Sequence, residues 1–278
     1  MQVPTTLEEV LYLASSSDAL NREPDLIRAL SVSISSRNQT PHLGSVLSCA
    51  EIISCAQRIK AKYPYRISLT LSKGHAALGL YCSLLLRKKI SESELLSFAQ
   101  TGSFLEEHPN PELPEVDFPS GSLGHGLSLV SGYVLGSDIQ NLTTGGIVIM
   151  SDGECNEGTV WEAALFVATK KISRLVAIID ANGWQATGRV SETFGTASLK
   201  AMFEGFGWRG QVVDGHNAKI LEDAINYGLI SGGPYFIVAE TTKGKGVSFM
   251  EDDNNWHYRI PNQMECQRAL AEIFAGNL

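Results

Sequence analysis

The feature that most constrains the fold is an alternation, in the second half of the chain, between short apolar runs and longer helix-like segments. The runs are rich in β-branched residues and continuously apolar, which is typical of parallel strands covered on both faces. They are GIVIM, RLVAIID, GQVVDG and YFIVAET, and helix-like segments such as EGTVWEAALFVATKK separate them. This pattern predicts an α/β fold with a doubly wound, mainly parallel sheet and helices on both faces.

The first half of the chain is more helical. Residues 6–36 carry helix-type periodicity, and residues 66–89 indicate a short strand, a glycine-containing turn and a mostly buried helix. Residues 101–125 are rich in Pro, Gly and acidic side chains, and a loop of that length in a compact chain is usually functional. No repeat, low-complexity tract or linker is visible, so we expect residues 1–278 to form a single domain with a helical N-terminal lead.

Charge and cysteine content narrow the class of protein. The chain has 22 basic and 30 acidic residues, a net charge of −8, and no basic stripe, so we expect no nucleic-acid partner. Its five cysteines form no Cys-x-x-Cys pair, which is typical of reduced thiols in a cytosolic protein. The N-terminus lacks a signal-peptide pattern and no window approaches a membrane-spanning length, so we expect a cytoplasmic location and no membrane contact.

Two predicted strands end in side chains suited to a hard cation. GIVIM is followed by Asp152 and Gly153, and RLVAIID is followed shortly by Asn182. One βαβ crossover separates Asp152 from Asn182, so we expect their oxygens at neighbouring strand ends, where parallel sheets bind ligands. Mg²⁺ prefers such oxygens together with phosphate, and the helix expected from about Asn156 directs its positive end to the same place. Either strand end alone is more often a loop cap, but the pair favours a metal–phosphate site.

These residues resemble the thiamin diphosphate-binding motif, in which Gly-Asp-Gly is followed one crossover later by Asn; here Ser151 replaces the first Gly. The surrounding segments SDGECNEGTVWEAALF and VAIIDANGWQATGR are similar to transketolases. PHLGSVLSCAEI, LSKGHAALGLY, EHP, GSLGHGLS, VDGH and TTKGKGVSFME match the same family in the same order. The resemblance runs from about residue 25 to the C-terminus. It implies a diphosphate-binding domain of the PP type, with thiamin diphosphate and Mg²⁺ (or Ca²⁺ or Mn²⁺) as cofactors.

The resemblance also implies which residues hold the cofactor. Asp152, Asn182 and the backbone oxygen of Trp184 would bind the metal, and the sequence assigns no role to the Trp184 indole. The residues implied to contact thiamin diphosphate are His75, Gly121, Leu123, Asp152, Gly153, Glu157 and Asn182.

All six histidines lie beside Gly, Pro, Asn or Trp in predicted turns or loops. Singly, a loop histidine is more often a solvated surface residue, but six in such settings favour a polar cleft built from strand-end loops. By resemblance, His42 and His257 would polarise a carbonyl and exchange protons, and His108 would contact the donor's terminal hydroxyl. His125 replaces the usual Gln, so a further imidazole is expected to face the cofactor, whereas His216 is expected to shape a turn.

Acidic residues carry two further expectations. Glu157 and Glu162 are expected on the helix after Asp152, and in transketolases the acids at these positions lie at the contact between subunits; the alternative is a solvated helix face. Glu106 and Glu107 precede His108, in a segment that in the family usually carries arginine and small residues. Fewer cations there disfavour ordinary sugar phosphates, and favour a substrate with a different tail or one whose anion the partner holds.

Full transketolases have three domains, and this chain resembles the first alone. The glutamate that acts on the aminopyrimidine, the pocket around that ring and most phosphate-binding residues are missing from it. The resemblance therefore implies the N-terminal subunit of a split transketolase, inert alone. Its partner would be a C-terminal subunit carrying the pyrimidine-binding and terminal domains, in an α2β2 heterotetramer that works on sugars or sugar phosphates.

Other functions stay open at this point. The cofactor motif also fits a thiamin-dependent 2-oxoacid decarboxylase, a dehydrogenase subunit or a deoxyxylulose-phosphate-type synthase. A non-catalytic regulatory subunit that retains the fold is a further alternative, although the intact Asp152, Asn182 and histidines disfavour it. A Rossmann dehydrogenase and a Walker nucleotide-binding protein are poorly supported, since neither glycine-rich pattern is present.

Overall fold

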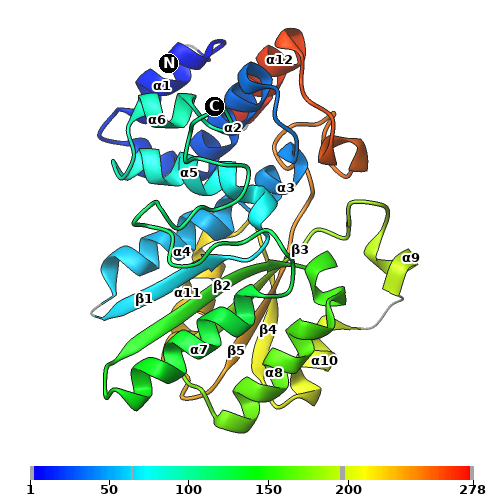
Figure 1. Ribbon diagram of the computed structural model, residues 1–278. Helices are drawn as coiled ribbons and strands as arrows, with labels where there is room; N and C mark the ends of the chain where they lie inside the picture. Colours follow the sequence, from blue (N-terminus) through cyan, green and yellow to red (C-terminus); the bar gives the residue numbers. More distant parts are fainter. Residues whose placement is uncertain (1–2, 64, 195–197, 276–278) are drawn as a thin grey trace.

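A computed structural model describes residues 3–63, 65–194 and 198–275. Five strands form one fully parallel sheet in the order β1-β2-β3-β5-β4 (Figure 1). The strands are β1 Arg66–Leu71, β2 Thr144–Ser151, β3 Leu175–Ala181, β4 Arg209–Asp214 and β5 Tyr235–Glu240. The predicted parallel α/β sheet is therefore confirmed.

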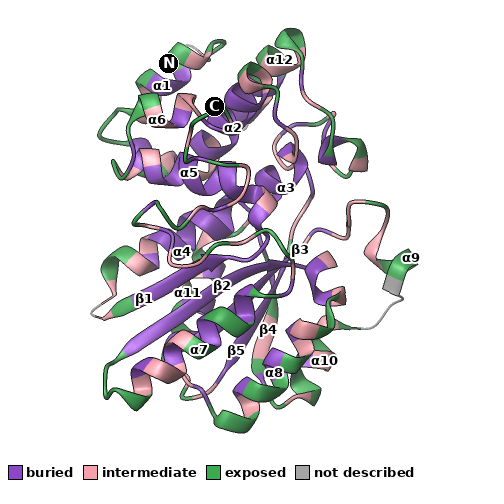
Figure 2. Ribbon diagram, viewed as in Figure 1, coloured by how far each residue is buried: buried purple, intermediate pink, exposed green. Residues whose placement is uncertain are grey.

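Helices cover both faces of the sheet, which explains why its strands are continuously apolar. On one face pack α7 Gly126–Ile139, α8 Gly158–Lys170 and α10 Leu199–Gly205, and on the other α4 Ala50–Lys62 and α11 Ala218–Ile230 (Figure 1). Alternate residues of one strand face opposite cores: Val148 and Met150 join the first group of helices, and Ile147 and Ile149 join the second. The middle strands are buried along their length (Figure 2).

A helical layer lies beyond the carboxyl ends of the strands (Figure 1). Its members are α1 Leu7–Ala14, α2 Glu23–Asn38, α3 Leu43–Ser48, α5 Ala77–Leu86, α6 Glu92–Leu96 and α12 Gln263–Ala275. The predicted helical lead corresponds to α1 and α2, joined by a 3-10 turn at Ala19–Arg22. Helix α2 lies at the centre of this layer, with Ile27, Leu30 and Ile34 fully buried. The expectation of a single domain stays a prediction.

Short elements complete the chain at the strand ends. They are α9 Val190–Phe194 and the 3-10 turns Gly74–Ala76, Gly153–Asn156 and Asn254–His257. The helix expected from about Asn156 begins instead at Gly158, because a 3-10 turn occupies the residues directly after Asp152. In the ranges described, no helix is long and apolar enough to cross a membrane.

The contact between α7 and β2 depends on Gly146. A Cβ at this position would overlap Val130 Cγ1 and lie 3.1 Å from Val134 Cγ2. Gly132, on the outer side of the same helix, has no atom within 4 Å of its would-be Cβ. We expect Gly146→Ala to lower the free energy of unfolding by about 1–3 kcal/mol through overpacking. Gly132→Ala should raise it by about 0.5–1 kcal/mol.

Urea unfolding of both variants, followed by circular dichroism, measures the two free energies. Equal effects of the two substitutions would contradict this account of the α7–β2 contact.

Candidate active site

The carboxyl ends of β2 and β3 bring the predicted metal-binding side chains together. Ser151 pairs with Asp180 in the parallel register, so Asp152 and Asn182 follow at adjacent strand ends, as expected. A cavity of about 290 Å³ opens there. Of the residues singled out by the sequence, its lining includes His42, His75, Gly121, Leu123, Gly153, Glu157, Asn182, Trp184 and His257.

Asp152 is a buried carboxylate whose negative charge has no close cationic partner. Its Oδ1 accepts the N–H of Gly153 at 2.8 Å, and its Oδ2 accepts the N–H of Gly183 at 2.6 Å. Across the described ranges, no ion pair joins it to a basic side chain. Burial, followed by the nearby charge of Asp180, raises the pKa of Asp152 to about 7. A bound cation would relieve this cost.

Asp180, by contrast, is fully paired, and the sequence analysis did not identify it as a site residue. Its carboxylate forms an ion pair with Lys73, and both side chains are 0 % exposed. Ser48 Oγ donates to Asp180 Oδ2 at 2.7 Å, and Thr241 Oγ1 donates to Oδ1. Burial alone would raise the pKa of Asp180, but Lys73 and these donors hold it below its usual value.

Lys243 is a second residue that the sequence analysis missed, and its charge is the counterpart of that of Asp152. The side chain is buried, and Nζ lies 2.6 Å from Asn254 Oδ1 and 3.2 Å from His257 Nδ1. No carboxylate within the described part of the chain forms an ion pair with it. Burial, followed by the charge of Lys73, lowers its pKa to about 8.

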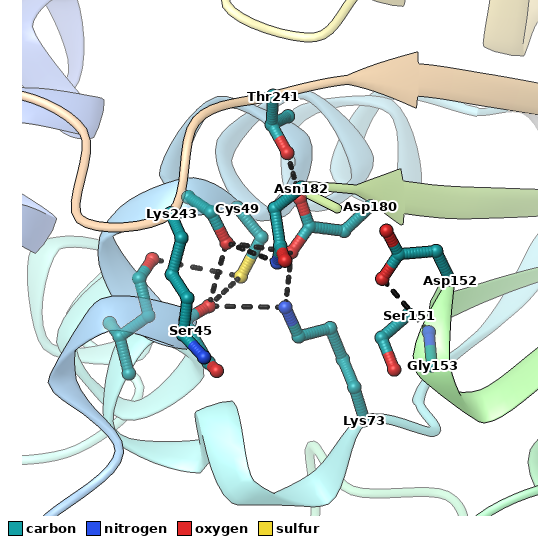
Figure 3. Close-up of polar contacts among 12 residues, drawn as sticks. Ser45, Cys49, Lys73, Ser151, Asp152, Gly153, Asp180, Asn182, Thr241 and Lys243 are labelled. Carbon is teal, nitrogen blue, oxygen red and sulfur yellow. Dashed lines mark hydrogen bonds and ion pairs between the residues drawn. The ribbon is translucent and has the colours of Figure 1, made fainter. Parts of the chain in front are cut away.

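Figure 3 shows these residues around the strand ends. A buried acid without a cation and a buried base without an anion flank one cavity, so the donor set fits a metal ion bound together with an anion. No group of three His, Cys, Asp or Glu side chains that could hold a metal occurs among the described residues. A hard cation here would therefore need backbone, amide and ligand oxygens besides Asp152.

Three histidines form one cluster at the cavity. The ring centroids of His42 and His257 are 5.1 Å apart, and that of His75 lies 5.5 Å from His42 and 5.6 Å from His257. The N–H of His42 donates to the carbonyl of His257 at 2.9 Å, which joins the two loops. His42 has a φ of 69°, a left-handed conformation that is uncommon for non-glycine residues and often found at functional sites.

The histidines of this cluster are neutral at pH 7. Burial lowers the pKa of His42 to about 4 and that of His257 to about 3, with further lowering by Lys243 at both. Burial and the charge of Lys73 hold the pKa of His75 well below its usual value. Each neutral imidazole offers one donor and one acceptor to a bound ligand.

The other three histidines differ in position. His108 stands beside the cavity, where glycines allow its ring to approach: a Cβ at Gly121 would lie 3.5 Å from His108 Cδ2. His125 is exposed and does not line the cavity, and its Nδ1 lies 3.1 Å from the carbonyl oxygen of Ser122. The expectation that His125 faces the cofactor is not met.

His216 is structural, as expected for a residue that shapes a turn. Its Nε2 accepts the N–H of Thr242 at 2.9 Å, so Nδ1 carries the proton and donates to Glu51 Oε2 at 3.1 Å. Glu51 also pairs with Arg28 at 2.5 Å. This chain of contacts fastens the loop after β4 to α4 and α2.

The carboxylates after β2 have different environments. Glu154 is fully buried and accepts bonds from the Ser72 hydroxyl and, at 2.8 Å, from the N–H of Gly124, so it joins the loops after β1 and before α7 to the end of β2. Glu162 lies exposed on α8. Glu157 is also exposed but precedes α8 as its N-cap, so it is not within the helix as expected.

The Trp184 indole, left without a role by the sequence, holds the loop beyond β3. Its Nε1 donates to Asp252 Oδ1 at 2.8 Å, and Arg189 binds both oxygens of the same carboxylate at 2.7 Å. The Arg189 guanidinium also lies 3.7 Å from the centre of the indole ring. The N–H of Trp184 donates to Asn182 Oδ1 at 3.0 Å, which links the loop to the predicted metal site.

Comparison with known proteins identifies what this architecture resembles. The family described as "Transketolase, thiamine diphosphate binding domain" matches residues 20–263. One of the named subunits of the apulose-4-phosphate transketolase of Phocaeicola vulgatus is 30% identical over 264 residues, covering 92% of this chain and 94% of that protein. Human transketolase-like protein 2 is 34% identical over 270 residues, which cover 94% of this chain but 42% of that protein.

The fold is also that of solved transketolases. The Campylobacter jejuni transketolase structure superposes with a TM-score of 0.79 at 24% identity, over 94% of this chain and 47% of that one. The chain thus spans nearly all of the Phocaeicola vulgatus protein and less than half of the longer proteins.

The buried charge of Lys243 gives a pH-dependent stability. Because its pKa is about 8 in the folded chain and ordinarily 10.5, the unfolded chain binds more protons between these values. The charge therefore destabilises the ligand-free fold fully below about pH 8, and this effect fades as the pH approaches 10.5. We expect Lys243→Met to raise the free energy of unfolding at pH 7 by about 1–2 kcal/mol, with a smaller gain at pH 9.5.

Urea titrations at both pH values check this difference. Lys245→Met is the matched control, since Lys245 is partly exposed and pairs with Glu251; its effect should stay within about 0.5 kcal/mol. A loss of stability in Lys243→Met that is equal at both pH values would contradict the prediction.

Proposed function

The chain belongs to the transketolase family, as its thiamine diphosphate-binding domain, and from this premise we propose that it is the N-terminal subunit of a two-chain transketolase. With its partner it would transfer a two-carbon ketol unit from a ketose or ketose phosphate to an aldose. The observation that carries the proposal is the pair of uncompensated buried charges, Asp152 and Lys243, at one cavity. Thiamin diphosphate with its metal ion supplies the two missing charges.

The residues present fit this cofactor. Asp152, the Asn182 side-chain oxygen and the Trp184 carbonyl would hold Mg²⁺, or Ca²⁺ or Mn²⁺ in its place. Gly153 would let the backbone approach the diphosphate closely, and Lys243 and His75 would supply positive charge and a hydrogen-bond donor. The cofactor contacts that we also propose are the backbones of Gly121 and Leu123 at the ring, with Glu157 toward the partner.

When bound, thiamin diphosphate supplies the carbon nucleophile that takes up the two-carbon unit. The chain's own part is proton handling: His42 and His257 would polarise the donor carbonyl and exchange protons at its oxygens, and His108 would position a terminal hydroxyl. Their low pKa values in the ligand-free chain, at His42 and His257, arise from burial and nearby lysine charge. A diphosphate would offset the lysine charges, which raises the imidazole pKa values toward the range useful for proton transfer.

A second chain would complete the site, and the nearly equal length of relatives that are themselves transketolase subunits supports this. We propose a C-terminal subunit with pyrimidine-binding and terminal domains, in an α2β2 assembly. The outer sides of α7 and α8 expose Leu129, Leu165 and Phe166 beside Glu162, and exposed apolar groups of this kind suit a contact between subunits. A cytoplasmic location stays a prediction.

The alternatives receive less support. Relatives of nearly equal length are named as transketolases, which favours ketol transfer over 2-oxoacid or deoxyxylulose-phosphate-type chemistry. Glu106 and Glu107 add negative charge near His108, and an anionic substrate tail would therefore be held by the partner rather than by this loop.

Removing the proposed metal ligand separates cofactor binding from folding. We expect Asp152→Ala to weaken thiamin diphosphate binding in Mg²⁺ by more than about 10-fold, measured by calorimetry on the full chain. The same variant should unfold no more easily than the wild type without ligand, because it removes a buried, unpaired acid. Asp223→Ala, on the exposed face of α11, is the control with unchanged binding. Unaltered cofactor affinity in Asp152→Ala would refute the proposed metal site.

The two-chain assignment predicts that the purified chain is inert alone. With thiamin diphosphate, Mg²⁺, a ketose donor and an aldose acceptor, no transfer should occur until the partner is added. A native pull-down from the source cells in Mg²⁺ buffer supplies that partner, and a donor screen of ketoses against pyruvate separates ketol transfer from 2-oxoacid chemistry. Turnover by the chain without a partner would overturn the assignment.

A further inference from the structure

The amide of Asn182 can bind a cation through one end only. Its Oδ1 is a metal ligand, whereas its Nδ2 carries two protons and repels a cation. Asn side chains can rotate by half a turn at little cost unless their neighbours distinguish the two ends. A metal site that uses Asn182 therefore depends on whatever holds the oxygen toward the cavity.

The neighbours of Asn182 distinguish its two ends. Nδ2 donates to Asp180 Oδ2 at 3.1 Å and faces Ser48 Oγ at 3.4 Å (Figure 3). Ser48 gives its own proton to the same Asp180 oxygen at 2.7 Å, so its Oγ is left as an acceptor. On the opposite end, Oδ1 accepts the N–H of Trp184 at 3.0 Å. In the reversed orientation an oxygen would face a carboxylate and an NH₂ group would face an N–H.

Asp180 is itself held in place by groups other than Asn182. Lys73 forms its ion pair and Thr241 donates to Oδ1, while Lys73 Nζ also donates to the carbonyl of Ser45 at 3.1 Å. Asp180 is 0 % exposed and its oxygens already accept bonds from Lys73, Ser48, Thr241 and Asn182. It is therefore placed to orient a ligand of the metal rather than to bind the metal.

We propose that Asp180 is a positioning residue: anchored by Lys73 and Thr241, it keeps the oxygen of Asn182 directed at the cation that accompanies the cofactor diphosphate. This inference rests on the proposed function, because it assumes that a metal binds at Asn182. Lys73 belongs to the loop after β1 and Asp180 to β3, so the orientation of one metal ligand depends on the contact between these two segments.

Two double variants isolate the acceptor from the buried charge. Lys73→Met with Asp180→Asn removes both charges but keeps an oxygen that can accept from Asn182. Lys73→Met with Asp180→Leu removes the same charges and has a similar shape, but has no acceptor. Replacing both partners avoids an unpaired buried ion, which would otherwise cost the fold dearly.

The measurement is the affinity of the full chain for Mn²⁺ in the presence of thiamin diphosphate, from the electron paramagnetic resonance signal of free Mn²⁺. We expect the Leu variant to bind Mn²⁺ about 10–100-fold more weakly than the Asn variant. Ser48→Ala, a milder change, should lower the affinity less. Equal affinities of the Asn and Leu variants would overturn the inference.

A second background tests whether orientation is the cause. With Asn182→Asp both ends of the side chain are oxygens, so the change from Asn to Leu at position 180 should no longer alter Mn²⁺ affinity. A loss of the same size in this background would assign Asp180 a merely structural role and overturn the inference. Absence of Mn²⁺ binding by the wild-type chain would instead refute the proposed cofactor site, and the inference with it.

Discussion

The buried ion pair between Lys73 and Asp180 is the interaction on which the strand ends depend. It joins the loop after β1 to the end of β3, across the intervening β2, and Lys73 also reaches the carbonyl of Ser45 in α3. A pair of this kind contributes little net stability compared with apolar packing, but loss of one partner leaves an unpaired charge at great cost. Its effect is therefore to specify one arrangement of the loops from which the cavity is built.

Around this paired core, the remaining charges are arranged without partners of their own. Asp152 and Lys243 are each buried, with opposite shifts of pKa, and the imidazoles of His42 and His257 are held neutral. The ligand-free protein thus carries a stored electrostatic cost that a metal diphosphate would remove. Binding and folding stability are consequently coupled, as for any ligand that prefers the native state.

The sequence predicted the parallel sheet and much of the site, because strand ends and loop histidines are local patterns. Asp152 and Asn182 lie at adjacent strand ends as expected, and His42, His75 and His257 meet at the cavity. Lys73, Asp180, Lys243 and Glu154 were missed, since a charge inside or after an apolar run has meaning only through partners distant in sequence. Asp180 ending RLVAIID was the available signal: a lone carboxylate closing a fully apolar strand requires a buried cation. The catalytic roles and the single domain stay predictions.

The loop that carries Trp184 has an optical consequence. The chain contains four tryptophans; Trp208 and Trp256 are buried in the cores, and Trp161 stacks on Phe206. Trp184 alone of the four lines the cavity, and a carboxylate and a guanidinium touch its indole. Its emission is therefore sensitive to charge entering the site, so the protein carries a built-in fluorescent reporter of cavity occupancy, readable without any label.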